Sequence, residues 1–514
     1  MTPDPRRPVT PGPRPSGTSD QRRPVNPVPR PPGTPDPRRP GTPSAQPPAE
    51  ASTTPAAIDL AVARGPAVGG KAGPLAELLR TGFDVPPGFV VPTDLFRDAL
   101  AALPGTGTPA SSPPGPDSGR AVRGDAGPEV REQILAAELP PRATADIATA
   151  LDRLTEQSAS GCVAVRSSSS SEDTDRSSAA GQHHSALAVR GRAGVIAAIR
   201  ACWASTFSDR AVAYRARPAA ENGTDEMAVL VQEWIDPEVA GVMFTHPRGP
   251  GGPGAVTTVE ATWGIGEGLV SGRVTPDSWT VDETGVRARR IGSKTVRGDR
   301  VSDTIITKPV PEADRTRPCL TDDDVRRLHG IGVRIVQALG GARDIEWALA
   351  DGRLWILQAR PVTAELPSGD PAAPAVPAAG AQRAGAQGAA DRDPAGDPPR
   401  PDDGAGPAML HGVAGAAGTA SGPVRHVCGP ADFRRVRPGD VLVCRETDPA
   451  WTPLFTVAAA VVTETGGLLS HAAIVAREIG IPAVLAVPGA STALQEGAFV
   501  LVDGGRGTVG PAPG

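Results

Sequence analysis

The chain has 514 residues, which is too long for one hydrophobic core and predicts two to four domains. Its formal net charge is −5, so the composition excludes the strongly basic field of a protein whose main partner is nucleic acid. Glycine (61) and proline (59) are abundant and gather in a few segments. Only three of the 52 basic residues are lysines, namely Lys71, Lys294 and Lys308.

The five cysteines are odd in number and far apart, with no CxxC pair or Cys/His cluster. This pattern argues against a disulfide scaffold and against a zinc site. The N-terminal segment lacks the apolar stretch of a secretory signal, and no run approaches the roughly 18 apolar residues that span a bilayer. We therefore expect a reduced, cytoplasmic location and no membrane partner.

Residues 1–55 are rich in proline and arginine, with the pentapeptides DPRRP, DQRRP and DPRRP beginning at Asp4, Asp20 and Asp36. Such a tract buries almost nothing, so it predicts an extended or disordered tail. The arginines could meet an acidic partner, although a solvated tail is the favoured interpretation.

Residues 56–363 predict one large α+β unit, with a Gly/Pro/Ser-rich surface insertion over 104–128. Helices are expected over 75–80, 94–100 (capped by Thr93 or Asp94) and 195–207. Strands are expected over 88–91, 162–165 and 227–232. A hairpin is expected over 344–360, with its turn at 350–352.

Residues 364–408 are mostly Ala, Gly, Pro and Asp, a composition typical of a flexible linker. Residues 409–514 predict a compact α/β domain. Its expected strands cover 441–444, 458–463, 483–486 and 499–503, and its clearest helix covers 471–479.

The segment from Gly65 to Ala72 satisfies the GxxxxGK pattern, but Ala72 stands where a P-loop needs Ser or Thr to hold Mg²⁺. What remains is a Gly-Gly-Lys turn that opens a helix. The rare Lys71 is well placed there to meet phosphate oxygens, while an ordinary surface turn is the alternative.

Arg166 ends a predicted buried strand and is followed by five serines, and Gly181 and Ser185 lie beyond them. An arginine beside backbone N–H groups and hydroxyls suits an anionic ligand. A serine run is also ordinary loop composition, so the pattern leaves both interpretations open.

In the predicted hairpin, Asp344 and Glu346 alternate with apolar residues and share one strand face, as do Gln358 and Arg360. If the hairpin closes, Glu346 and Gln358 can hold a hard cation through oxygen, with Arg360 nearby for phosphate charge. The alternative is an amphipathic edge hairpin.

His471 follows a Gly466-Gly467 turn and Ser470, which can cap the helix that His471 begins. A helix N-terminus disfavours imidazolium and favours attached negative charge, so His471 would be neutral and nucleophilic. A lone histidine at a helix start is more commonly a cap or a surface residue.

Together these residues resemble the family of pyruvate phosphate dikinase, phosphoenolpyruvate synthase and rifampicin phosphotransferase. GGKAGPLAELL, VAVRSSSSSEDT and RDIEWALADGRLWILQARPVT look like its ATP-grasp domain, and TETGGLLSHAAIVAREIGIPAV looks like its swivelling phosphohistidine domain. The resemblance implies an α+β and α/β multidomain fold, in which a flexible linker joins an ATP-grasp nucleotide-binding domain to a small α/β swivelling domain.

The resemblance also implies an ATP-dependent phosphotransferase that uses ATP and Mg²⁺, phosphorylates its own His471 and releases AMP and phosphate. Its implied ATP-site residues are Lys71, Arg166 and Arg360 on the phosphates, Gly181 and Ser185 in the phosphate loop, Gln232 at the adenine hinge, and Glu346 and Gln358 as Mg²⁺ ligands.

Two features depart from the family pattern. Ala179 stands where the family has an aromatic residue, and 364–408 is too short and polar to form the family's third, substrate-binding domain. The phosphoacceptor, a small molecule or a protein, is therefore not identified, and a partner protein could supply its site. A nucleotide-binding phospho-signalling module, or one part of a split rifampicin-type antibiotic phosphotransferase, is the alternative.

Overall fold

The computed structural model describes residues 55–104, 127–156, 158–169, 184–208, 211–212, 226–246, 255–362 and 409–512. They all fall within one compact unit, residues 53–514. The predicted tail and linker, and almost all of the predicted insertion, lie outside the described residues. In the described part of the chain, no helix is both long enough and apolar enough to cross a membrane.

The first sheet is antiparallel, with the strand order β1-β2-β5-β3-β4. Its strands are β1 (Ile58–Asp59), β2 (Gly88–Val91), β3 (Cys162–Ser169), β4 (Ser185–Arg190) and β5 (Met227–Glu233). Along the central strand β5, Val229 and Val231 face one core while Ala228 and Leu230 face another. This period of two is what a strand covered on both faces requires.

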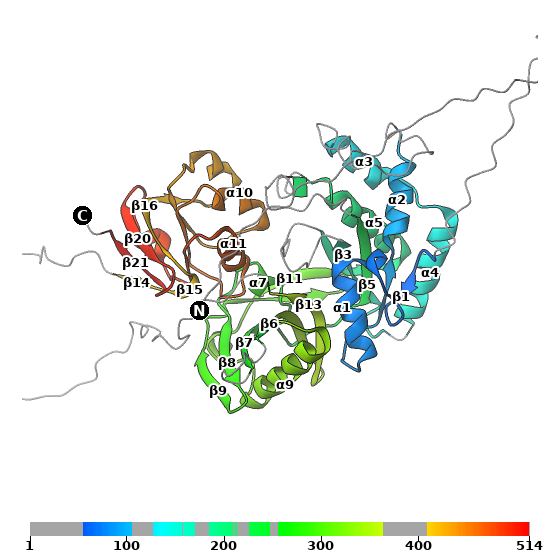
Figure 1. Ribbon diagram of the computed structural model, residues 1–514, viewed down its shortest axis with the longest axis horizontal. Helices are drawn as coiled ribbons and strands as arrows, with labels where there is room; N and C mark the ends of the chain where they lie inside the picture. Colours follow the sequence, from blue (N-terminus) through cyan, green and yellow to red (C-terminus); the bar gives the residue numbers. More distant parts are fainter. Residues whose placement is uncertain are drawn as a thin grey trace, which may run out of the picture. The chain divides into compact units, whose positions relative to one another are not determined.

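Helices cover both faces of this sheet. The helices are α1 (Gly69–Arg80) on one face, after the short η1 (Pro66–Val68), and α2 (Thr93–Ala101), α3 (Gly127–Ala136), α4 (Pro141–Thr155) and α5 (Gly191–Ser205) on the other. Helix α1 also packs against β13 of the second sheet (Figure 1). It therefore lies between the two sheets that carry the predicted ATP-site residues.

The second sheet is also antiparallel, with the order β13-β12-β6-β7-β8-β9. Its strands are β6 (Val239–His246), β7 (Val256–Trp263), β8 (Asp277–Asp282), β9 (Gly285–Arg290), β12 (Arg343–Ala350) and β13 (Arg353–Pro361). Helix α9 (Asp322–Leu339) lies along this sheet (Figure 1). The neighbouring elements are α7 (Glu267–Val270), α8 (Glu312–Arg315) and the hairpin β10 (Val296–Val301) with β11 (Thr304–Pro309).

The β12–β13 hairpin is the predicted one. Asp351 and Gly352 form its turn with positive φ values of 51° and 72°, which match the right-handed twist of the two strands. Glu346 lies opposite Gln358, and Asp344 lies opposite Arg360. The side chains that the sequence predicted on one face are therefore neighbours across the hairpin.

The third sheet has the order β14-β21-β20-β16-β17-β18-β19-β15, and β16 to β19 run parallel. Its strands are β14 (Leu410–His411), β15 (Val413–Ala416), β16 (Thr419–His426), β17 (Val441–Cys444), β18 (Ala460–Thr463), β19 (Ala483–Leu485), β20 (Phe499–Asp503) and β21 (Thr508–Pro511). Helix α11 (His471–Ile479) covers one face. The shorter helices are η2 (Pro430–Arg435), η3 (Pro449–Trp451), α10 (Thr452–Phe455) and α12 (Ala490–Ala493).

Three local expectations were wrong. Helix α2 begins at Thr93 with Pro92 at its N-cap, and neither Thr93 nor Asp94 caps it. Ser470 occupies the N-cap of α11, but its hydroxyl donates to the Gly467 carbonyl and does not cap the helix. The first three serines after Arg166 do not begin a loop, because β3 continues to Ser169 by pairing with Met227–Val229 of β5.

Candidate functional site

Ser168 holds the start of helix α1 against β3. Its buried hydroxyl accepts hydrogen bonds from the backbone N–H groups of Lys71 and Ala72, both at 3.1 Å, and donates to the Val68 carbonyl at 2.8 Å. Gly69 allows this approach, since a Cβ atom there would lie 1.8 Å from the Ser168 carbonyl oxygen. Lys71 is thereby fixed beside the strand that carries Arg166.

Arg166 joins β3 to the β12–β13 hairpin. Its guanidinium donates to the Leu357 carbonyl at 2.6 Å, to the Gln358 side-chain oxygen at 2.7 Å and to the Glu346 carboxylate at 2.9 Å. Ser185 lies opposite Arg166 in the β3–β4 register. The structure thus brings together four of the predicted site residues: Arg166, Ser185, Glu346 and Gln358.

The oxygens of Glu346 and Gln358 are suited to a divalent cation. Both lie within hydrogen-bond distance of the same nitrogen, Nη2 of Arg166, so they already converge on one positively charged atom. Among the described residues no group of three or more His, Cys, Asp or Glu side chains could enclose a metal ion. One carboxylate and one amide oxygen, completed by phosphate oxygens and water, fit Mg²⁺.

Arg360 is paired with Asp344 on the same hairpin. Its guanidinium donates to the carboxylate at 2.7 Å and 2.8 Å, and both side chains are largely buried. Burial raises the pKa of Asp344 even though Arg360 opposes the shift. The sequence pattern placed Asp344 on this face but gave it no role. The ion pair shows that Asp344 orients the Arg360 side chain.

Gln232 is not part of this group. The Gln232 side chain is buried and donates to the Pro86 carbonyl at 3.0 Å, which ties the end of β5 to the segment before β2. Its predicted place at an adenine hinge stays a prediction, and Gly181 lies outside the described residues.

His471 is the first residue of α11 and is buried, with 3% of its surface exposed. Its Nδ1 atom lies 3.1 Å from the Thr447 hydroxyl, and the Phe455 ring stands edge-on at 6.2 Å between ring centroids. Sequence reasoning missed Thr447, because 24 positions separate it from His471 and only the folded contact identifies it.

The glycine loop before His471, residues 464–470, contacts the second sheet. The carboxylate of Glu260 on β7 accepts hydrogen bonds from the backbone N–H groups of Leu468 at 2.8 Å and Leu469 at 3.0 Å. Burial raises the pKa of Glu260, while Arg290, these two N–H groups and Arg477 oppose the shift. Sequence reasoning also missed Glu260, the one charged residue of the strand Val256–Trp263, because nothing in the local pattern links it to His471.

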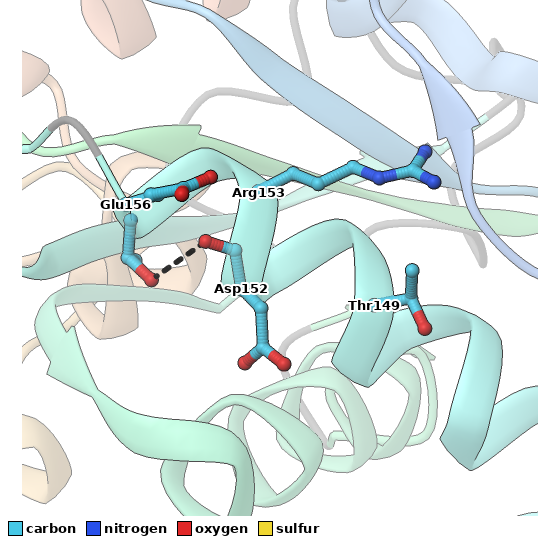
Figure 2. Close-up of a pocket in the computed structure, with 5 residues that line it drawn as sticks. Thr149, Asp152, Arg153 and Glu156 are labelled. Carbon is cyan, nitrogen blue, oxygen red and sulfur yellow. Dashed lines mark hydrogen bonds between the residues drawn. The ribbon is translucent and has the colours of Figure 1, made fainter.

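A surface hollow lies elsewhere, at the end of α4 (Figure 2). It is lined by Thr149, Asp152, Arg153, Thr155 and Glu156. The Asp152 carboxylate is engaged by Arg192 of α5, and Arg153 extends away from Asp152 (Figure 2). The hollow contains none of the predicted site residues.

Two protein-family descriptions match this chain. "Pyruvate phosphate dikinase, AMP/ATP-binding domain" matches residues 65–375, and "PEP-utilising enzyme, mobile domain" matches residues 436–507. The first match contains Lys71, Arg166, Glu346 and Gln358, and the second contains His471.

Curated relatives match both regions. The "Probable phosphoenolpyruvate synthase" proteins of Methanothermobacter thermautotrophicus and Archaeoglobus fulgidus are each 33% identical to this chain over 86% of its length. The chain spans 61% and 56% of their respective lengths. A solution structure of Enzyme I overlaps 15% of this chain and 32% of that chain at 30% identity, with a TM-score of 0.14.

The family match over 65–375 covers most of the α+β region that carries the Arg166 group, and the second match covers the glycine loop and α11. The chain belongs to the family defined by the pyruvate phosphate dikinase AMP/ATP-binding domain, here combined with a PEP-utilising enzyme mobile domain.

Proposed function

We propose that this protein is an ATP-dependent phosphotransferase that loads a phosphoryl group from ATP onto His471 and then passes it to an acceptor. The observation that carries the proposal is the convergence of Arg166, Glu346 and Gln358 from two sheets. One positive group and two oxygen ligands at one place are what the triphosphate of a nucleotide and its Mg²⁺ require.

In the proposed loading step, Nε2 of His471 is the nucleophile. The Thr447 hydroxyl lies 3.1 Å from Nδ1 and can accept a hydrogen bond from it in the tautomer that carries its proton on Nδ1 and its lone pair on Nε2. The lone pair attacks the β-phosphorus, the bond to the α,β-bridging oxygen breaks, and AMP leaves. Water then attacks the terminal phosphorus, the bond from that phosphorus to the β,γ-bridging oxygen breaks, phosphate and a proton leave, and one phosphoryl group stays on His471.

The proposed site residues have separate roles in this step. Lys71, Arg166 and Arg360 offset phosphate charge, and the positive end of the α11 dipole favours the anion formed on His471. Mg²⁺ held by Glu346 and Gln358 would neutralise developing charge on the phosphates. We also propose that Gln232 contacts the adenine and that Gly181 and Ser185 belong to the loop that covers the phosphates.

The acceptor is a separate part of the proposal. The relatives' names offer phosphoenolpyruvate as the first product to test, and pyruvate as the matching acceptor. This chain spans only part of their length, so an acceptor site on a partner protein is an equal candidate. For location we propose the reducing cytoplasm, which suits five free thiols, four of them buried.

The test is incubation with Mg²⁺ and ATP labelled at the β-phosphate, comparing the wild type with His471→Ala. His411→Ala is the matched control, because His411 is an exposed histidine on β14 of the third sheet, the sheet that α11 covers. We expect acid-labile, alkali-stable label on the wild type and the control, with AMP in solution, and neither product with His471→Ala. ATP binding with no label on the wild type would contradict the proposal and favour a nucleotide-binding module.

A further inference from the structure

We propose that Glu260 is the docking residue that holds the glycine loop, residues 464–470, on the ATP-binding region so that His471 can be phosphorylated. This inference rests on the proposed function, because it assigns a positioning role in the loading step. The carboxylate belongs to the region matched as the AMP/ATP-binding domain, whereas the loop belongs to the region matched as the mobile domain.

The two backbone donors make this contact specific. Leu468 and Leu469 each donate an N–H group to a different oxygen of Glu260, and the carboxylate is fully buried. Hydrogen bonds to a charged acceptor in a buried site are stronger than neutral ones. Because Leu469 lies two positions before His471, the contact fixes the backbone from which α11 begins.

The loop fits Glu260 only because it carries glycine. A Cβ atom on Gly467 would lie 2.5 Å and 2.6 Å from the two carboxylate oxygens, closer than any ordinary contact. Two positions earlier, the Thr465 hydroxyl donates to the Gly272 carbonyl at 2.6 Å, a third hydrogen bond between the same two regions. The close approach therefore depends on the glycine in the loop as well as on Glu260.

Charge and apolar packing complete the docking surface. Arg477 of α11 is partly buried and donates to the Leu468 carbonyl at 2.9 Å, so the loop residue that binds Glu260 is also held by a cation of its own domain. Leu469 packs with Val242, Phe244 and Leu269 of the ATP-binding region. These contacts suit a reversible dock, since the apolar cluster is small and one side chain makes the central hydrogen bonds.

The first experiment measures the rate at which His471 gains label from β-labelled ATP in full-length Glu260→Gln. The amide offers one acceptor oxygen in place of two and turns an N–H group toward a backbone N–H. We expect the rate to fall by about tenfold or more, with ATP affinity unchanged. Glu238→Gln is the matched control, because Glu238 of the same region is exposed and accepts one backbone N–H.

A second pair of variants tests the contact from the loop side. Gly467→Ala should slow labelling in the wild-type background, but it should add little once Glu260→Ala has removed the oxygens that the new Cβ atom would strike. Thr465→Val, which removes the hydroxyl's hydrogen bonds to the Gly272 carbonyl and to the Arg445 carbonyl of its own region, should give a smaller loss and keeps the test valid if Glu260 variants fold poorly.

The outcomes separate the two proposals. An unlabelled wild type would reject the proposed function itself. If the wild type is labelled, any one of three results would overturn the docking role alone. These results are a wild-type labelling rate in Glu260→Gln, fully additive losses in the double variant, and a loss confined to ATP affinity. A slower rate with unchanged ATP affinity and non-additive losses supports it.

Discussion

Arg166 of β3 and Glu346 of β12 form an ion pair of 2.9 Å although 180 positions separate them in the chain. The pair joins the first sheet to the second. Both side chains keep some exposure, 14% for Arg166 and 30% for Glu346, so the pair adds little to stability. Its position beside Gln358 supports its proposed role in ligand binding, because a bound nucleotide would meet all three groups at once.

Arg166→Lys tests this assignment. A lysine ammonium is a point charge on a flexible stem and cannot reproduce the three directed contacts of the guanidinium. We expect the affinity for Mg²⁺–ATP to fall by about tenfold or more, which corresponds to the loss of one or two charge-assisted hydrogen bonds. Titration calorimetry with ATP and Mg²⁺ measures the change.

The control for Arg166→Lys is Arg192→Lys, which alters an exposed pair with Asp152 on the surface of the first region. It should leave ATP affinity unchanged. Both variants should keep the wild-type free energy of unfolding to within about 1 kcal/mol. An Arg166→Lys protein that binds ATP normally would remove Arg166 from the proposed site.

The sequence was sufficient to predict the elements whose structure is decided by local chemistry. The β12–β13 hairpin combines an Asp-Gly turn with alternating polar residues, so its turn and the pairing of Glu346 with Gln358 could both be predicted. The same holds for α11, whose start after Ser470 follows from a glycine pair and a run of small helix-forming residues.

Contacts between distant segments could not be predicted. Ser168 meets Lys71 across 97 positions, and Glu260 meets Leu468 across 208 positions. The serine run was misjudged for the same reason: serine has little intrinsic strand preference, and pairing with β5 together with the donors at the start of α1 keeps β3 extended to Ser169. Tertiary partners override composition at such positions.

Ser168→Ala should weaken the packing of α1 on β3. The substitution leaves the N–H groups of Lys71 and Ala72 buried without their acceptor. We expect a loss of about 1–2 kcal/mol in the free energy of unfolding, the usual cost of removing a side chain that binds the first N–H groups of a helix. Urea unfolding measures the loss, and ATP affinity should fall with it because Lys71 is displaced.

Ser167→Ala is the matched control for Ser168→Ala. Ser167 is equally buried on β3, but its hydroxyl has no hydrogen-bond partner among the described residues. Removing that hydroxyl should leave stability unchanged or slightly raised. Equal losses from the two substitutions would contradict the role given to Ser168.

Asp277→Asn should destabilise the second sheet strongly. Asp277 and Lys294 form an ion pair of 2.5 Å in which both side chains are fully buried, and the carboxylate also accepts from the N–H groups of Gly292 and Cys319. Neutralising Asp277 leaves the Lys294 charge buried without a counter-ion, which costs about 3–5 kcal/mol. Asp323→Asn, on the exposed pair with Arg326, should change the unfolding free energy by less than about 1 kcal/mol.

Stability should fall as the pH drops below neutrality, and His329 should contribute to that fall. Burial lowers the pKa of His329 below its ordinary value of 6.5, against the opposing charges of Asp282 and Glu283. Below pH 6.5 the unfolded chain therefore takes up this proton more readily than the folded one, so the free energy of unfolding falls with pH down to the folded-state pKa, and the loss stays constant below it. His329→Gln should show a smaller difference in unfolding midpoint between about pH 7.5 and about pH 5.5.

Thr447 supplies the last prediction, which concerns the proposed loading step. Its hydroxyl lies 3.1 Å from Nδ1 of His471 in a buried environment, where it can hold the ring in the tautomer that leaves the lone pair on Nε2. Thr447→Val keeps the shape of the side chain and removes the hydroxyl. We expect the rate of His471 labelling to fall by about tenfold, with ATP affinity unchanged.

Thr447→Ser distinguishes the hydrogen bond from the packing. Serine keeps the hydroxyl and loses the methyl group, so it should label at close to the wild-type rate if the bond to Nδ1 matters. A loss in the serine variant with little or none in the valine variant would mean that Thr447 acts by filling space beside His471. The rate of His471 labelling, measured alongside ATP affinity for each variant, therefore decides between tautomer control and simple packing.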